Sequence, residues 1–372
     1  MSDLLDYKCP ACNGALEFDT KTQKMLCPFC GSTYEMSELA QKDTVLDTQQ
    51  PDFGNAAQAQ QGDQFNWNGE AGQDWGGEDA NMSVYSCKFC GGEIVGDANT
   101  VATACPYCGN PVVMSGRLSG MLKPDFVIPF KLDKRAAKDK LKSYVASKKF
   151  APNSFKSENK LDEIKGIYVP FWLFDSNINA SVSYEGTRVR TWSDRNYEYT
   201  ETSYYDIFRQ GNMAFANIPV DGSTNMPDDL MESIEPYDFN DAVSFQTAYL
   251  AGYLADKYDV DMQASIPRAN ERIKSSAEET LRGTVDGFAS VTTKYSSVQL
   301  LNGVSKYALY PVWLLNTTYK GEKYTFAMNG QTGKFIGNLP VDKGKLARLF
   351  AGVAAGVTAA VYVVGSLLLG LF

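Results

Sequence analysis

The 372-residue sequence contains no histidine, and this absence excludes several kinds of site. Without an imidazole there is no Ser-His-Asp or Cys-His nucleophile, no HExxH zinc protease and no histidine-ligated metal. Any metal site must therefore use cysteine, aspartate or glutamate. A chain of this length predicts two or more domains, with enough apolar material for a buried core.

Positive charge is absent from one long stretch. Between residues 43 and 82 there are eight acidic residues and no lysine or arginine, so this segment accounts for most of the net charge of −9. The remainder carries 36 acids against 35 bases. A nucleic-acid-binding protein needs a basic surface, which neither the total charge nor the cysteine-rich regions provide. We therefore do not expect nucleic acid as a partner.

The eight cysteines form four CxxC pairs with none left over. Fourteen residues separate the two pairs of each quartet, and the quartets are Cys9, Cys12, Cys27 and Cys30, and Cys87, Cys90, Cys105 and Cys108. Two CxxC turns can place four thiolates around one zinc ion at Zn–S distances of about 2.3 Å. Such a closed site has no open coordination position, so we predict two structural zinc sites, no catalytic residue and no other cofactor.

Two alternatives use the same cysteines. Iron in a rubredoxin-like site accepts the same four ligands. The pair Cys105-Pro-Tyr-Cys108 by itself resembles a glutaredoxin redox pair, but it lacks the βαβ context and comes with a partner pair. Gly or Asn follows each CxxC pair, which lets the turn adopt left-handed backbone and point N–H groups at the thiolates.

The two ends of the chain differ. Residues 1–7 have neither a positive region nor an apolar run, so no signal peptide is expected. The 24 residues from Leu349 to Phe372 carry no charge and, as a helix of about 1.5 Å per residue, would cross a ~30 Å hydrocarbon core. The preceding bases Lys343, Lys345 and Arg348 place the N-terminal bulk in the cytoplasm by the positive-inside rule. A buried C-terminal helix of a soluble domain is the alternative.

Small residues at Gly352 and Gly356 form a GxxxG within this predicted transmembrane helix. This spacing allows two helices to approach closely in lipid, so helix–helix association through these glycines is one expectation. The alternative is that glycine and alanine are simply common in membrane helices.

The chain is expected to be multidomain, with two small zinc ribbons, an α+β domain with an antiparallel sheet, and one C-terminal transmembrane helix. The predicted segments are zinc ribbon 1 (1–40), a disordered acidic linker (41–83), zinc ribbon 2 (84–116), a helical connector (117–165), the α+β domain (166–340), a basic juxtamembrane segment (341–348) and the transmembrane helix (349–372). The linker is too poor in aliphatic side chains to offset its chain entropy. Its aromatic residues Phe65, Trp67 and Trp75 are interpreted as stray, with a short docking motif as the alternative.

Within the connector, residues 133–149 predict a helix with Asp133 as N-cap and an apolar stripe of Ala137, Leu141, Tyr144 and Val145. Seven bases and two acids occupy it. We favour a solvated polar face over attraction to anionic lipid.

The α+β domain predicts strands over 167–190, 197–216 and 288–337, with helices over 228–234, 247–257 and 266–282. Turns are expected at Asn329-Gly330 and Thr332-Gly333. Pro170-Phe-Trp172-Leu is echoed by Pro311-Val-Trp313-Leu, which predicts two related strand units paired in one sheet, each starting with Pro and burying its Trp.

The tandem CPxC-x14-CPxCG pattern resembles the TFIIB-type and rubredoxin-like zinc ribbons. Together with the YVPFWLF and YPVWLL strands, the FAMNGQTGKFIGNLP hairpin and the apolar tail, nearly the whole chain resembles a family of bacterial tandem zinc-ribbon membrane proteins, often labelled helicase-like or primosomal-protein-like. Relatives encoded beside phage-shock-protein-A and SPFH (flotillin-like) proteins imply an adaptor role in envelope stress, with those proteins as partners. Lys88 replaces the usual Pro without affecting the ligands. A helicase label lacks support, because the nearest Walker A match, at Gly333-Lys334, has Met328 and Phe335 at positions that need Gly and Ser or Thr.

Three hypotheses for function follow. The first is a tail-anchored membrane adaptor or scaffold that recruits cytosolic proteins. The second is a nucleic-acid-binding zinc-ribbon protein of replication or transcription. The third is an enzyme with an unrecognised site in the β domain, since Asp, Glu, Lys and Tyr can perform acid–base work without histidine. No spacing identifies such a site, so we expect a non-enzyme.

Overall fold

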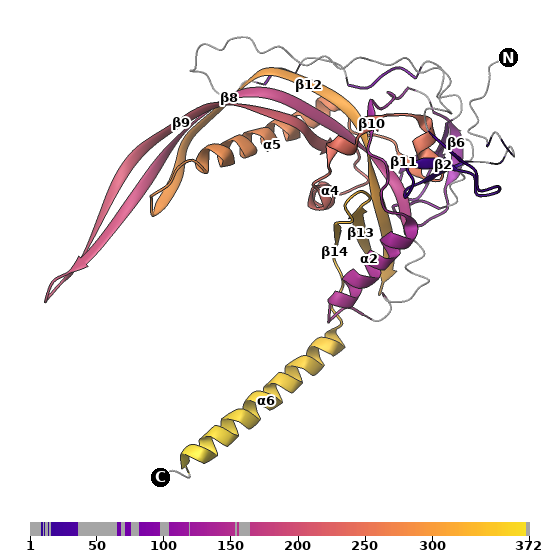
Figure 1. Cartoon of the computed structure of the whole chain (residues 1–372). Coiled ribbons are helices and arrows are strands. Elements are labelled where there is room, and N and C mark those ends of the chain that lie inside the picture. The colour runs from indigo at the N-terminus through magenta and orange to yellow at the C-terminus, as the bar shows by residue number, and fades with distance from the viewer. Residues whose placement is uncertain are drawn as a thin grey trace.

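The computed structural model describes residues 9, 11, 14, 16–35, 65–67, 71–75, 82–96, 104–118, 120–152, 155 and 164–369 (Figure 1). Its helices are α2 (Lys134–Ser147), α4 (Asp228–Ile234), α5 (Met262–Arg282) and α6 (Lys343–Leu369). Its strands are β1 (Glu17–Asp19), β2 (Lys24–Leu26), β3 (Thr33–Tyr34), β4 (Ser83–Ser86), β5 (Glu93–Gly96), β6 (Val113–Arg117), β7 (Phe126–Val127), β8 (Lys165–Ser193), β9 (Glu198–Asp221), β10 (Val243–Ser244), β11 (Leu254–Asp256), β12 (Ser290–Tyr319), β13 (Glu322–Asn329) and β14 (Phe335–Gly337).

Three long strands dominate the fold. β8 pairs antiparallel with both β9 and β12, and the three curve together as one arched ribbon (Figure 1). Along β8, buried Ile178, Ala180, Val182 and Tyr184 alternate with more exposed polar residues. This period of two is the pattern of a sheet with one buried face, so the predicted strands are confirmed here.

Helix α5 covers the buried face of the ribbon on the inside of the arch (Figure 1). Asp261 caps its start by accepting a hydrogen bond from the Ala264 N–H at 2.7 Å. Its apolar stripe, with Ala269, Ile273 and Ala277 fully buried, repeats at helical spacing. The helix predicted over 266–282 is therefore confirmed and begins one turn earlier.

The repeated Pro-x-Trp-Leu units lie on β8 and β12, which are neighbours in the sheet. Both tryptophans are buried, and their indole N–H groups donate to backbone carbonyls at 2.9 Å, Trp172 to Val260 and Trp313 to Leu132. The carbonyls of Pro170 and Pro311 accept equivalent hydrogen bonds from glycine N–H groups at 2.8 Å. The pairing prediction is confirmed, but the prolines lie inside the strands rather than at their starts.

The second cysteine region is continuous with the main sheet. Strands of the main sheet follow the order β10-β7-β12-β8-β11-β5-β4-β6. Strand β11 therefore joins the strands around the second quartet, β5, β4 and β6, to the long strands β8 and β12. The helix predicted over 247–257 is wrong: Thr247–Leu250 forms a 3-10 turn, and Gly252, at φ +83°, precedes strand β11. Burial of Leu254 and Ala255 between β8 and β5 overrides their helical preference.

Residues 65–67 and 71–75, which lie in the predicted disordered linker, are ordered against the rest of the chain. Trp67 packs against Phe174 with ring centroids 4.9 Å apart, and its indole N–H donates to Asn270 at 2.9 Å. Trp75 is buried edge-on against Phe245. The interpretation of these residues as stray aromatics is corrected, because pockets in the distant β domain supply the apolar surface that the segment lacks.

At the C-terminal side, the Asn329–Gly333 turn joins β13 to β14 as predicted, with Gly333 at φ +77°. The basic juxtamembrane residues form the first turns of α6. By length and composition, helix α6 is long and apolar enough to cross a membrane, and none of its residues from Lys343 to Tyr362 is buried. The alternative of a helix buried in the body is therefore wrong for this part of the chain.

Candidate metal centre

Each CxxC pair starts the same backbone turn. The N–H of the first cysteine donates to the carbonyl five residues later, and these bonds are Cys9 to Gly14 (2.8 Å), Cys27 to Ser32 (2.8 Å), Cys87 to Gly92 (2.9 Å) and Cys105 to Asn110 (2.8 Å). Glycine follows three of the pairs, at φ +73° for Gly31, +78° for Gly91 and +75° for Gly109. This left-handed conformation favours glycine and lets the chain reverse around the two sulfurs.

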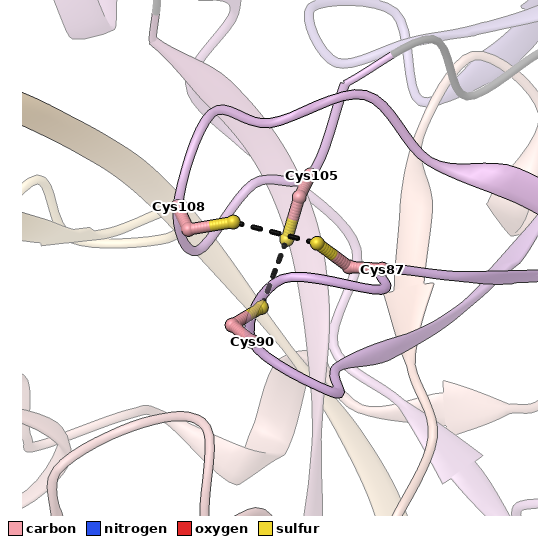
Figure 2. A group of neighbouring side chains, drawn as sticks. All are labelled: Cys87, Cys90, Cys105 and Cys108. Atoms are coloured by element: carbon pink, nitrogen blue, oxygen red, sulfur yellow. Dashed lines mark hydrogen bonds between the residues drawn. The ribbon is translucent and has the colours of Figure 1, made fainter.

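The second quartet brings its four sulfur atoms together. Cys87, Cys90, Cys105 and Cys108 come from two facing turns, and their Sγ atoms all lie within 4.8 Å of one another (Figure 2). The Sγ–Sγ distances are 3.4 Å for Cys87–Cys108 and 3.6 Å for Cys90–Cys105. A tetrahedron with Zn–S bonds of about 2.3 Å has S–S edges of ~3.8 Å, so the cluster already has nearly the size of a metal site.

The first quartet shows three of its predicted ligands. The Sγ atoms of Cys9, Cys27 and Cys30 lie within 4.8 Å of one another, and Cys9 and Cys30 are 3.5 Å apart. Cys12 lies outside the described residues. Ser32 occupies the position after Cys30 that Asn110 occupies after Cys108, and its hydroxyl is 3.3 Å from the Cys30 sulfur.

The surroundings of the second cluster act on the pKa values of its thiols in opposite directions. Burial raises the pKa of the Cys105 and Cys90 thiols. Burial also acts to raise the pKa of Cys108, but the Asn110 side chain and N–H outweigh it and lower that pKa to about 7. Four thiolates with one divalent ion carry a formal charge of −2, so donors such as the Asn110 Nδ2, 3.4 Å from the Cys108 sulfur, stabilise the loaded site.

The donor set fits zinc. Four cysteine sulfurs are the usual ligands of a closed structural zinc site, and the same set also accommodates iron. If zinc is bound, it would be held by the sulfurs alone and would contribute folding free energy without an open position for substrate.

Polar contacts fix the second cluster to the ribbon of long strands. The Lys165 ammonium donates to the Ala104 carbonyl at 2.7 Å, and the Asn316 side chain donates to the Pro106 carbonyl at 2.6 Å. Lys257 pairs with Glu93 at 2.6 Å across the β11–β5 junction. The turn from Cys105 to Cys108 is thereby held by residues more than 60 positions away in the sequence.

The first cluster is also docked on the body. Phe18 packs edge-on against Tyr249 with ring centroids 5.2 Å apart. The Gln23 side chain donates to the Phe130 carbonyl at 2.9 Å, and Lys21 pairs with Asp133, the N-cap of α2, at 2.8 Å. Both cysteine regions therefore pack on the rest of the chain, the first on Tyr249 and on residues at the start of α2.

Two acids near the second cluster, the buried Asp256 and the half-buried Asp221, were not predicted. Asp256 is buried, accepts a hydrogen bond from the Ser223 hydroxyl and lies beside Tyr107, within the Cys105–Cys108 turn. Burial raises the pKa of Asp256 to about 7, and burial together with nearby Asp228 raises that of Asp221 to about 7. No sequence signal identifies these acids, because Tyr107, Asp221 and Asp256 meet only in the folded chain.

Comparison with models of known protein families finds no match, and no solved structure matches. A Bacillus subtilis (strain 168) protein, "Uncharacterized protein YdjG", is 35% identical over 367 residues, which are 99% of each chain. The similarity therefore includes both cysteine regions, the β domain and the apolar helix.

Proposed function

Since the chain belongs to the same family as YdjG of Bacillus subtilis, whose name assigns no activity, we propose from its own residues that it is a tail-anchored membrane adaptor. In this proposal two structural zinc ribbons and the β domain form a platform that recruits cytosolic proteins to the membrane. The chain performs no catalysis of its own.

The exposure of α6 carries the proposal. Val353 and Val361 are 56% and 66% exposed, in a helix none of whose residues from Lys343 to Tyr362 is buried. Water would disfavour so much exposed apolar surface, whereas a hydrocarbon core would accept it. Gly352 and Gly356 have no neighbouring atoms at their Cβ positions, so this face is open to a second membrane helix.

The bases at the start of α6 support an orientation. Lys343, Lys345 and Arg348 immediately precede the uncharged run, and the positive-inside rule then keeps the body in the cytoplasm of a bacterial cell. The cytoplasm is reducing, which keeps cysteine thiols available for zinc. The four cysteines of the second cluster form no disulfide, as this location requires.

Two exposed phenyl rings support a role in recruitment. Phe29 and Phe89 occupy the same position in two CxxC turns and are 75% and 69% exposed. Rigid, exposed aromatic residues are enriched where proteins bind one another. The resemblance to tandem zinc-ribbon membrane proteins makes phage-shock-protein-A-like and SPFH-type proteins the first partners to test.

The test is affinity isolation from detergent-solubilised bacterial membranes. We expect the full chain to fractionate with membranes and to retain a defined set of proteins, and the variant Phe29→Ala with Phe89→Ala to lose at least one of them about tenfold. Tyr204→Ala is the matched control, because Tyr204 is 68% exposed but lies on the distant β8–β9 hairpin.

Two results would count against the adaptor. If a variant that lacks residues 343–372 still fractionates with membranes, the proposal that α6 anchors the chain is wrong. Recovery of DNA or RNA with steep salt dependence, in place of protein partners, would instead favour the nucleic-acid hypothesis.

A further inference from the structure

Three hydrogen bonds tie the end of α2 and the residues after it to the segment that runs from the end of β14 into the first turn of α6. The Asp342 N–H donates to the Phe150 carbonyl at 2.8 Å, and the Lys345 ammonium donates to the Ala151 carbonyl at 2.6 Å. The Tyr144 hydroxyl donates to the Gly337 carbonyl at 2.6 Å. In Figure 1 the C-terminal end of α2 lies at the point where α6 leaves the body.

A groove of about 480 Å³ lies between these two segments. One wall is the last turn of α2 and the residues after it, including Ser147, Lys148 and Lys149. The other wall is the chain that leads into α6, with the apolar residues Leu339, Pro340 and Val341. The Ser147 hydroxyl already donates to the Tyr144 carbonyl at 2.7 Å, so the groove offers the lysine ammonium groups beside an apolar surface. This is the combination that a phosphate-bearing headgroup and its glycerol region require.

The charge around the groove is positive. Lys148, Lys149, Lys343 and Arg348 are exposed, and Lys345 lies beside them. Asp342 is the acid of the adjoining segment, and its carboxylate is engaged in accepting the Gly344 N–H at 2.9 Å. An anion placed in the groove would therefore meet the two lysines of its wall, Lys148 and Lys149, and the three bases follow directly in the chain after its other wall.

The groove also lies at the depth of lipid headgroups if α6 spans the bilayer. The uncharged run starts at Leu349, and the turns from Lys343 to Arg348 rise about 8 Å at 1.5 Å per residue. The headgroup region of each leaflet is ~5–8 Å thick. The hydrogen bonds of Phe150 and Ala151 to this segment hold the end of α2 at the same level.

We propose that this groove binds the phosphate-bearing headgroup of an anionic phospholipid and so fixes the orientation of the body on the membrane. The inference rests on the tail-anchor proposal, because only an inserted α6 brings the groove to the lipid. The solvated face favoured for this basic helix by its sequence would then apply to its N-terminal part alone.

The test uses the full chain in phosphatidylcholine nanodiscs that contain a small fraction of phosphatidylglycerol, with retained lipid measured by native mass spectrometry. We expect one phosphatidylglycerol to be retained preferentially. Each basic residue near an anionic surface contributes about fivefold in affinity. The double variant Lys148→Gln with Lys149→Gln should therefore weaken retention of phosphatidylglycerol roughly 25-fold. Zinc content and circular dichroism confirm that the variant is folded.

Lys134→Gln with Arg135→Gln is the matched control, since it removes the same charge from exposed residues in the first turn of α2, about 20 Å away along the helix. Retention should be unchanged in this control. An equal loss in both variants, or no loss in the first, would overturn the proposal. Displacement of the lipid by an equal concentration of inorganic phosphate would also overturn it, because a soluble anion would then be the ligand.

Failure of the tail anchor would be seen separately. A chain without a membrane-spanning α6 would not enter nanodiscs at all, whereas a chain that enters but shows no preference for phosphatidylglycerol refutes only the headgroup site.

Discussion

Asp256 illustrates how burial sets the chemistry of a single residue. Its carboxyl group is buried beside Tyr107, and burial raises its pKa to about 7. The unfolded chain would release this proton near pH 4. Between about pH 4 and pH 7 the folded state binds more protons than the unfolded state. This group therefore makes the unfolding free energy fall as pH rises from about 4 to about 7.

Asp256→Asn should remove this dependence. The amide stays neutral, so relative to the variant the wild-type chain should lose about 2 kcal/mol of unfolding free energy between pH 5.5 and 7. Denaturant unfolding of both proteins in detergent at several pH values measures the difference. The comparison cancels the effect of acid on the thiolate sites, which is common to both chains.

Asp194→Asn provides the control for this measurement. The N–H groups of Asn196 and Tyr197 donate to the exposed Asp194 carboxylate and hold its pKa below the usual range. Its contribution is lost only as pH falls through that lowered pKa. From pH 5.5 to 7 the unfolding free energy of the control should therefore have the same pH slope as that of the wild type. A parallel slope for Asp256→Asn and wild type would contradict the assignment.

At the scale of elements, residues 65–67, called the strap below, are held on the β domain by Trp67. Its ring lies against Phe174 and over Gly303, where even a Cβ on the glycine would approach the ring to 2.5 Å. Trp67→Ala should lower the unfolding free energy by about 3 kcal/mol through the lost contacts and the cavity left behind. Thermal or denaturant unfolding checks this value.

The exposed Tyr204 serves as the comparison, and Tyr204→Ala should change stability by less than about 0.5 kcal/mol. A Trp67→Ala variant as stable as Tyr204→Ala would mean that the strap is not held in solution. The composition of the segment predicted disorder because its own side chains cannot form a core. Its anchoring depends on apolar surface supplied by residues more than 100 positions later in the chain.

For the whole molecule, the two candidate metal sites should contribute unequally to stability. The strands around the second site belong to the main sheet, whereas β1, β2 and β3 form a separate three-stranded sheet. Cys87→Ser and Cys27→Ser should each reduce zinc from two ions to one per chain. Cys87→Ser should also destabilise the body by ~3 kcal/mol or more, lowering the melting temperature by about 6–12 °C.

Metal analysis and thermal unfolding in detergent measure both effects, and removal of zinc with a chelator should reproduce the larger shift. Equal melting temperatures for the two variants would show that the second site is not coupled to the sheet. Unchanged zinc content in either variant would contradict the ligand assignment.

The sequence by itself determined the cysteine turns, the long strands and the apolar helix, because each depends on residues close together in the chain. CxxC spacing places two sulfurs on one turn, alternation over β8 defines one buried face, and an uncharged run is a property of composition. Tertiary structure decided the rest, because it depends on residues brought together from far apart. Examples are the pairing of β11 with β5, the packing of Trp67, the proximity of Tyr107 to Asp256, and the hydrogen bonds between the end of α2 and the segment before α6.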